Sequence, residues 1–314
     1  MDNQKQYNWM VCVQCMTYNQ SIYIEDALNG FTMQETNFPY VCIICDDAST
    51  DGEQDVIKNY LEQHFELEDK IATRNEETED YVLRFARHKT NHNCFFAVFL
   101  LKYNHYSIKH PKGGYFFEWL GTKYIALCEG DDFWTDSNKL QNQVDFLEAH
   151  LECSICATGA QELYPDGRFE DKVPFEVKEF YTTEDFLTKK RFVATCSIVY
   201  RWKYLSNQPR PKFMEICKVG DYPLFLYMCT KGKFGFINKV MSVHRFAAVN
   251  SWTRRTNTIK RRWESFYNSF FTFSEFDKYT NRKYHREISK VKFRIFFLCM
   301  KSIAGILLKR IVRI

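Results

Sequence analysis

The stretch "LCEGDDFWTDSNKLQNQVDFLE" (residues 127–148) ends an apolar strand in an acidic turn and then continues as an amphipathic helix. Glu129, Asp131 and Asp132 fall within four residues, where ionised carboxylates repel one another unless a cation or a hydrogen-bond network compensates them. The helix is expected at 136–150. The stretch therefore predicts a cation site directly after a buried strand.

Strand and helix patterns alternate on both sides of this stretch. Strands are predicted at 11–16, 41–45, 123–128, 153–160 and 192–201, helices at 21–34, 51–65 and around 222–230, and a hairpin-like segment at 233–246. Such alternation predicts an α/β fold with a mixed, mostly parallel sheet flanked by helices. The segment 76–112 is harder to interpret: its apolar run 94–103 is predicted as a helix, and its role is left open.

Composition predicts one large domain with an appendage of different character. The chain has 314 residues, 45% of them hydrophobic, and the polar first ten residues contain no apolar signal segment, so a cytoplasmic location is expected. Residues 254–314 hold sixteen Lys and Arg against four Asp and Glu, whereas residues 1–253 are net acidic. We therefore expect a domain at 1–253 and a basic helical extension at 254–314.

The twelve cysteines are predicted to be buried free thiols. Two of the three Cys-x-x-Cys pairs, Cys12/Cys15 and Cys42/Cys45, lie in predicted strands. Residues three apart in a strand point to opposite faces, so neither pair can bind one zinc ion together.

Polar residues follow three of the predicted strands: Thr17–Asn19, Asp46–Asp47 and Glu129–Asp132. In an open α/β sheet, ligands bind beyond the carboxyl ends of the strands. The chain contains no glycine-rich phosphate loop of either common type, which counts against a dehydrogenase or a P-loop ATPase. A divalent cation, Mg²⁺ or Mn²⁺, is therefore expected to hold any diphosphate, with carboxylates and phosphate oxygens as ligands.

These residues occur in five blocks whose order resembles the family 2 glycosyltransferases, inverting enzymes of the GT-A fold that use nucleotide-diphosphate sugars. The blocks are "VCVQCMTYNQSIYIEDAL" (11–28), "FPYVCIICDDASTDG" (38–52), "KYIALCEGDDFWTDSNKLQNQVDFLE" (123–148), "TCSIVYR" (195–201) and "VGDYPLFLYMCTKGKFGFINKVMSVHR" (219–245). The resemblance covers residues 9–253 and is closest to bacterial capsular and O-antigen polysaccharide glycosyltransferases with an E-G-D-D-[YF]-W motif. It implies transfer of a sugar to a glycan or lipid-linked acceptor, with a Rossmann-like sheet.

The resemblance also implies roles for individual residues. Thr17 and Tyr18 would frame the nucleotide base, and Asp47 would accept from its ring N–H. Asp131 would lie near the ribose or diphosphate, Asp132 would bind Mn²⁺ or Mg²⁺, with Asp131 as a second candidate ligand, and Asp221 would be the catalytic base. The other implied donor-binding residues are Asn19, Asp46 and Glu129.

One departure from the family concerns the metal site. Many relatives read Tyr-Arg-x-His after the last strand, where this chain has His244 in the Tyr place and Ala247 in the His place. Two interpretations stay open: a protein ligand to the metal is lost, or His244 partly replaces it.

The tail 290–314 carries apolar runs broken by Lys301 and Ser302, too short for a membrane span. It predicts an interfacial helix on anionic lipid, at the inner face of the cytoplasmic membrane. A helix packed on the domain with a solvated basic face is the alternative. Nucleic acid is not an expected partner.

Two other classes of function are alternatives. A metal-dependent nucleotidyltransferase would also use paired acids, but we would expect a basic diphosphate-binding loop where the chain has "TYNQSIYIED" (17–26). A non-catalytic nucleotide-sugar or nucleic-acid binding module would not need Asp221. The sequence leaves the donor sugar, its nucleotide, the acceptor, the linkage and the oligomeric state undetermined.

Overall fold

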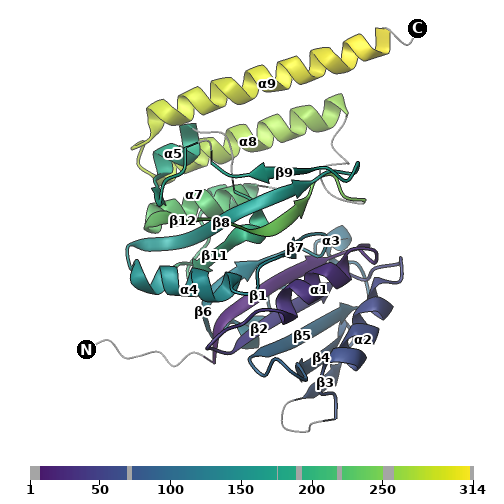
Figure 1. The fold of residues 1–314 in the computed structure, drawn as a ribbon. Coiled ribbons are helices and arrows are strands. Elements are labelled where there is room, and N and C mark those ends of the chain that lie inside the picture. Colours follow the sequence, from purple (N-terminus) through teal and green to yellow (C-terminus); the bar gives the residue numbers. More distant parts are fainter. Residues whose placement is uncertain are drawn as a thin grey trace.

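The structure, a computed structural model, describes residues 8–68, 73–174, 176–188, 193–217, 221–249 and 258–311, with side chains of the last helix described as far as Ala304. Figure 1 shows a large twisted sheet covered by helices, with two long C-terminal helices lying side by side at one end. The predicted α/β fold class, with a mixed sheet flanked by helices and a helical C-terminal extension, is confirmed.

The centre of the sheet is parallel. Strand β1 (Trp9–Thr17) pairs with β2 (Tyr40–Asp46) and β6 (Thr122–Leu127), and β2 pairs with β5 (Cys94–Leu101), all in parallel. Strand β2 is buried along its whole length, as expected for a strand covered on both faces. The carboxyl ends of these four strands therefore open on the same edge of the sheet.

Antiparallel strands extend the sheet on both sides of this centre. The full order is β10-β12-β8-β11-β6-β1-β2-β5-β4-β3, with β7 paired to β12 and β9 paired to β8. The outer strands are β3 (Arg74–Glu77), β4 (Tyr81–Arg87), β7 (Phe133–Trp134), β8 (Cys153–Leu163), β9 (Phe169–Lys172), β10 (Phe180–Tyr181), β11 (Ile198–Arg201) and β12 (Lys233–Arg245). Among the outer strands, only the β8/β12 pair is parallel in the described part of the chain.

Helices bury apolar side chains on each face of the sheet. One face is covered by α1 (Ile24–Thr32), α2 (Glu53–His64) and α4 (Lys139–Ala149). The other is covered by α5 (Thr183–Thr188), α6 (Lys212–Ile216), α7 (Asp221–Lys231), α8 (Ile259–Tyr279) and the start of α9 (His285–Ile311). Shorter helical turns are α3 (His105–Ile108), η1 (Phe117–Leu120), η2 (Thr195–Ser197) and η3 (Trp202–Tyr204).

Two predicted elements were wrong, and a third was predicted too long. The run 94–103, expected as a helix, is strand β5, because a fully buried strand between two neighbours shows the same unbroken apolar pattern as a buried helix. The segment 233–246 is one continuous strand with register shifts rather than a hairpin. The predicted strand 192–201 divides into the η2 turn and the short strand β11, while Phe192 lies outside the described residues.

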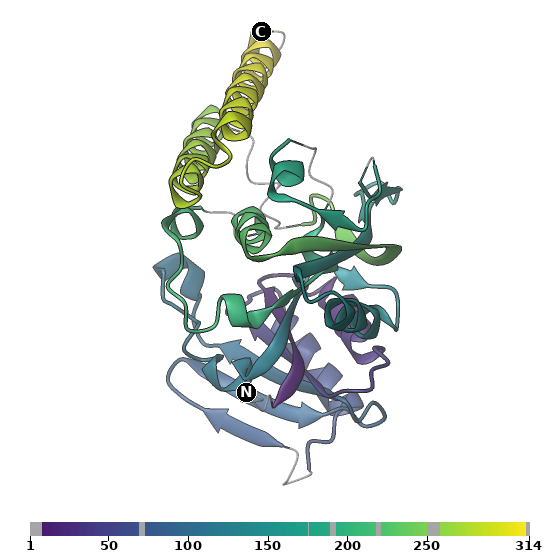
Figure 2. The same cartoon turned by 90° about the vertical axis from the view of Figure 1, so that its left-hand side faces the viewer.

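The C-terminal extension is an antiparallel pair of helices, which we call the α8–α9 hairpin. Ile288 and Val291 of α9 are buried with the core on this side of the sheet, and α9 also contacts α5. Figure 2 shows the pair leaning away from the body toward the C-terminal tip. Within the described residues, no helix is long and apolar enough to cross a bilayer. The boundary predicted near residue 253 stays a prediction, since residues 250–257 lie outside the described part.

All twelve cysteines are free thiols, as predicted, and ten of them are buried. Burial raises the pKa of the Cys45 thiol to about 12 and that of Cys153 to about 11. These cysteines therefore act as small apolar side chains in the core.

Candidate active site

The acidic turn predicted from residues 129–132 lies against the end of β1. The amide of Gly130 donates to the Met16 carbonyl at 3.3 Å, and the amide of Asp132 donates to the Glu129 carbonyl at 3.0 Å. A Cβ atom on Gly130 would lie 2.1 Å from the Thr17 hydroxyl oxygen, so only glycine fits here. This close approach brings the acidic turn and the end of β1 to the same place.

Arg245, at the end of β12, fixes the two aspartates. Its amide donates to Asp132 Oδ1 at 2.9 Å, and its Nη1 donates to the Asp131 carbonyl at 2.8 Å. Burial and the neighbouring Asp132 raise the pKa of Asp131 to about 6. Burial also raises the pKa of Asp132, partly offset by His244 and by the Arg245 amide. A buried carboxyl pair with raised pKa values is the electrostatic setting that a bound cation would relieve.

His244 lies beside this pair but also faces Glu162 of β8. Burial lowers the pKa of His244, yet Glu162 and Asp132 outweigh burial and raise it. Its Nδ1 lies 3.7 Å from Glu162 Oε1. No three His, Cys, Asp or Glu side chains in the described ranges are placed to hold one metal ion, so Asp131, Asp132 and His244 do not form a ready ligand set. Whether His244 binds metal stays a prediction.

The first two strands are joined at their carboxyl ends by Glu53, which sequence reasoning missed. Its carboxylate is buried and accepts from the Thr17 hydroxyl, from the Gln20 amide at 2.8 Å and from the Ser49 hydroxyl at 2.8 Å. Ser49 Oγ in turn accepts from the Asn19 amide at 2.8 Å. The available signal was an acid in the first turn of a helix, which by itself indicates only a favourable helix-dipole interaction.

The two aspartates after β2 are already engaged within the chain. Asp46 Oδ1 accepts from the Ser49 amide at 3.0 Å and from Gln54 Nε2 at 2.6 Å. Its Oδ2 is buried with no hydrogen-bond partner in the ranges described.

Asp47 binds the segment whose role the sequence left open. Its carboxylate accepts from the His105 amide at 2.8 Å and the Tyr106 amide at 3.1 Å, and Lys112 Nζ lies 2.8 Å from Oδ2. Residues 76–112 thus extend the sheet and return to the end of β2. A nucleotide base would compete with these donors for Asp47, so its predicted contact with the base is not tested by the structure.

Asp221 begins α7 and is held by the η2 turn. The Thr195 hydroxyl donates to Asp221 Oδ2 at 3.0 Å, and the Tyr222 amide donates to Oδ1 at 2.7 Å. The next residue, Cys196, donates its thiol hydrogen bond to the Val243 carbonyl at 3.7 Å, and its side chain lies beside Asp132, since burial and the charge of Asp132 raise the pKa of this thiol. One turn of the chain therefore contacts both Asp132 and Asp221, which sequence reasoning assigned to the metal and to the base.

Buried polar side chains donate hydrogen bonds to the carbonyl groups of the η2 turn. Trp134 Nε1 donates to the Cys196 carbonyl at 2.8 Å, and Gln143 Nε2 donates to the Ser197 carbonyl at 2.9 Å. Lys139 is fully buried, donates from Nζ to Gln143 Oε1 at 2.7 Å, and lies 4.2 Å from the centre of the Trp134 ring. Burial lowers its pKa to about 8.

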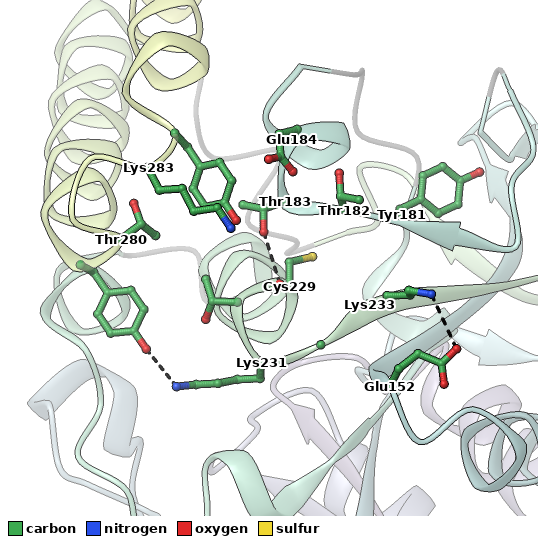
Figure 3. A pocket seen from close by; sticks show the side chains of 14 residues that line it. Glu152, Tyr181, Thr182, Thr183, Glu184, Cys229, Lys231, Lys233, Thr280 and Lys283 are labelled. Atoms are coloured by element: carbon green, nitrogen blue, oxygen red, sulfur yellow. Dashed lines mark hydrogen bonds and ion pairs between the residues drawn. The ribbon is translucent and has the colours of Figure 1, made fainter.

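A large cavity lies elsewhere, at the opposite end of α7 from Asp221 (Figure 3). It encloses about 780 Å³ and is lined by Lys231, Lys233, Lys283 and Tyr279 among others. Lys231 donates a hydrogen bond to the Tyr279 hydroxyl, and the Lys233 ammonium lies near Glu152. These two ammonium groups therefore do not point toward one common position in the cavity. A second cavity of about 580 Å³ adjoins Ser49 and Gln54, next to Asp46.

Comparison with known proteins identifies sequence relatives and solved structures of similar fold. No protein-family model matches the chain. An uncharacterized protein of Mycobacterium tuberculosis is 29% identical over 253 residues, covering 80% of this chain, which spans 62% of that relative's length. A Bacillus subtilis protein, TuaG, whose name assigns it to teichuronic acid biosynthesis as a glycosyltransferase, is 23% identical over 259 residues, covering 82% of this chain and 87% of TuaG.

Two solved structures are also similar. The mannosyltransferase PcManGT from Pyrobaculum calidifontis, solved with GDP-Man and Mn²⁺, superposes with a TM-score of 0.50 at 12% identity, covering 96% of this chain and 76% of PcManGT. TarS 1–349 of S. aureus, solved with UDP, gives a TM-score of 0.48 at 13% identity, covering 88% of this chain and 72% of that one.

Proposed function

This chain has the GT-A glycosyltransferase fold, and we propose that it transfers a sugar from a nucleotide-diphosphate sugar to a hydroxyl of a glycan or lipid-linked acceptor. The transfer is metal-dependent, inverts the anomeric configuration and serves cell-surface polysaccharide synthesis. The observation that carries the proposal is the η2 turn, whose Thr195 donates to Asp221 and whose Cys196 lies beside Asp132. The family resemblance of the five sequence blocks and the name of TuaG support the choice of reaction and pathway class.

The donor would lie across the carboxyl ends of β1, β2 and β6. Thr17 ends β1 and is followed by Tyr18 and Asn19, Asp46 ends β2 and is followed by Asp47, and Glu129 and Asp131 come after β6. Asp132, with Asp131 as a second ligand, fits a hard divalent cation, because buried carboxylates with raised pKa values gain from a nearby positive charge. Mn²⁺ or Mg²⁺ bound there would offset the negative charge of the diphosphate, and phosphate oxygens and water would supply the remaining ligands.

Asp221 would act as the base. As the acceptor oxygen bonds to the anomeric carbon, its proton passes to the Asp221 carboxylate, and the bond from that carbon to the phosphate oxygen breaks on the opposite face. The nucleotide diphosphate leaves with the electron pair of that bond. A single displacement of this kind inverts the configuration and needs no covalent enzyme intermediate.

We also place the reaction at the inner face of the cytoplasmic membrane, where lipid-linked acceptors would be available. The basic composition of the α8–α9 hairpin supports this location.

The test is a panel of nucleotide sugars assayed with purified protein. A cognate donor should raise the melting temperature only with Mn²⁺ or Mg²⁺, since a ligand that binds the native state stabilises it by mass action. The same donor should support transfer that chelator abolishes. If no nucleotide sugar stabilises the protein under any metal condition, the proposed donor class is wrong.

A further inference from the structure

Near the start of α9, one side of the helix is packed and the opposite side is exposed. Ile288 and Val291 are at most 4% exposed, whereas Phe293 is 66% exposed and Phe297 61%. At 3.6 residues per turn, Phe293, Phe297 and Met300 fall on one side of the helix. Large apolar side chains thus form a stripe on the outside of the hairpin.

The stripe continues onto α8. The rings of Phe266 and Phe296 lie 5.8 Å apart, which places Phe296 at the junction of the two helices. Phe270 lies beyond that junction, 36% exposed, and the Lys292 ammonium sits 4.8 Å from its ring centre. We call the residues Phe270, Phe293, Phe296, Phe297 and Met300 the aromatic face. An exposed apolar patch across two helices marks an interaction site.

Cations surround the aromatic face, and α9 carries a single acid, whereas Asp277 of α8 lies near Lys292. Lys290 and Lys301 are exposed and lie within about 80° of Phe293 around the helix, while Lys292 borders the face on the α8 side. Between His285 and Ala304 the sole acid is Glu287. The partner should therefore be both apolar and negatively charged.

We propose that the aromatic face docks on a bilayer of anionic phospholipid, with its rings at the boundary between headgroups and acyl chains and its lysines on the phosphates. A second copy of this chain fits less well, because a symmetric contact would bring two positively charged patches together. The proposal deepens the membrane location given above, but it does not depend on Asp132 or Asp221, so binding and catalysis can fail separately.

Point variants of the full chain test the proposal. Removal of α9 is unsuitable, because Ile288 and Val291 belong to the core. Phe293→Ser/Phe297→Ser removes two exposed rings, and Phe117→Ser/Leu151→Ser is the matched control, since those side chains are 73% and 71% exposed on the body. Each protein is sedimented with vesicles of phosphatidylglycerol and phosphatidylcholine, or of phosphatidylcholine alone.

Wild type and control should bind the phosphatidylglycerol vesicles, and Phe293→Ser/Phe297→Ser should bind them at least tenfold more weakly with an unchanged melting temperature. Lys290→Gln/Lys292→Gln/Lys301→Gln should weaken binding roughly fivefold per charge removed and reduce its salt dependence. Equal binding of wild type and Phe293→Ser/Phe297→Ser would overturn the proposal. So would a wild-type dimer that this variant dissociates, without any vesicle binding, because the face would then belong to a second copy.

Discussion

The Thr195 hydroxyl donates a 3.0 Å hydrogen bond to Asp221 Oδ2, and the side chain of the next residue, Cys196, lies beside Asp132. The carboxylate assigned to proton transfer is thus oriented by the same turn that contacts the carboxylate assigned to the cation. A base held by a fixed donor presents its free lone pairs in a defined direction, which proton transfer requires.

Asp221→Asn should lower kcat by about 10²-fold or more and leave donor affinity and melting temperature nearly unchanged. The amide keeps an acceptor for the Tyr222 amide, and its NH₂ group can donate to Thr195, whose hydroxyl can rotate. The measurement is steady-state transfer with donor binding by calorimetry. Asp55→Asn, at another helix start, is the control. Transfer within a few-fold of wild type would reduce Asp221 to a structural role.

Thr195→Val removes the donor to Asp221 and nearly preserves side-chain volume, so we expect kcat to fall about tenfold with the donor KM unchanged. Thr195→Ser keeps a hydroxyl and should restore most of the rate. If Thr195 had only a structural role, Thr195→Val would lower the stability of the protein but would not lower kcat while leaving KM unchanged. If Asp221→Asn is inactive while Thr195→Val is fully active, the positioning role fails and the base assignment stands.

Asp132→Asn should abolish metal-dependent stabilisation by the donor nucleotide while the protein stays folded. Asn keeps an oxygen for the Arg245 amide, and removal of a buried charge offsets the loss of other contacts. Thermal shifts with GDP or UDP, with and without Mn²⁺, measure this. Asp136→Asn, four residues further along the chain and paired with Lys239, should respond like wild type. An undiminished Mn²⁺-dependent shift in Asp132→Asn would remove this residue from the metal site.

Lys139 should make stability depend on pH. Burial lowers its pKa from 10.5 to about 8, so between these values the unfolded chain binds a proton that the folded chain has lost. The contribution of Lys139 to the free energy of unfolding therefore rises with pH across this window, by about 3 kcal/mol in total. Urea unfolding of wild type and Lys139→Met from pH 7 to 10.5 measures it, since other titrations cancel in the difference. A constant difference would show that Lys139 keeps an ordinary pKa in the fold.

Much of the fold could be predicted because its central strands and helices carry local patterns. The β-branched and apolar residues of β2 predict a strand, and the apolar residues that follow Asp221 predict the helix α7. Strand β5 could not be predicted, because eight consecutive apolar residues fit a buried strand and a buried helix equally well. Only its pairing between β2 and β4 distinguishes them.

The candidate site was predictable in its carboxylates but not in what holds them. Asp131, Asp132 and Asp221 follow from motif order, whereas the Thr195 bond joins residues far apart in the chain. Likewise Asp47 meets the amides of His105 and Tyr106 only because α3 returns over the end of β2. Contacts of this kind depend on tertiary packing, for which the sequence carries no local signal.

The burial of the thiols gives this chain a built-in set of reporters of local opening. Thiol labelling requires exposed thiolate, so Cys12 and Cys42 in the central strands should react only when the whole sheet opens. Cys299, whose thiol faces the Arg262 carbonyl across the hairpin, should react as soon as α9 separates from α8. The ratio of the labelling rate of Cys299 to that of Cys12 and Cys42 would measure how often the α8–α9 hairpin opens while the sheet stays closed. No cysteine would have to be introduced for this measurement.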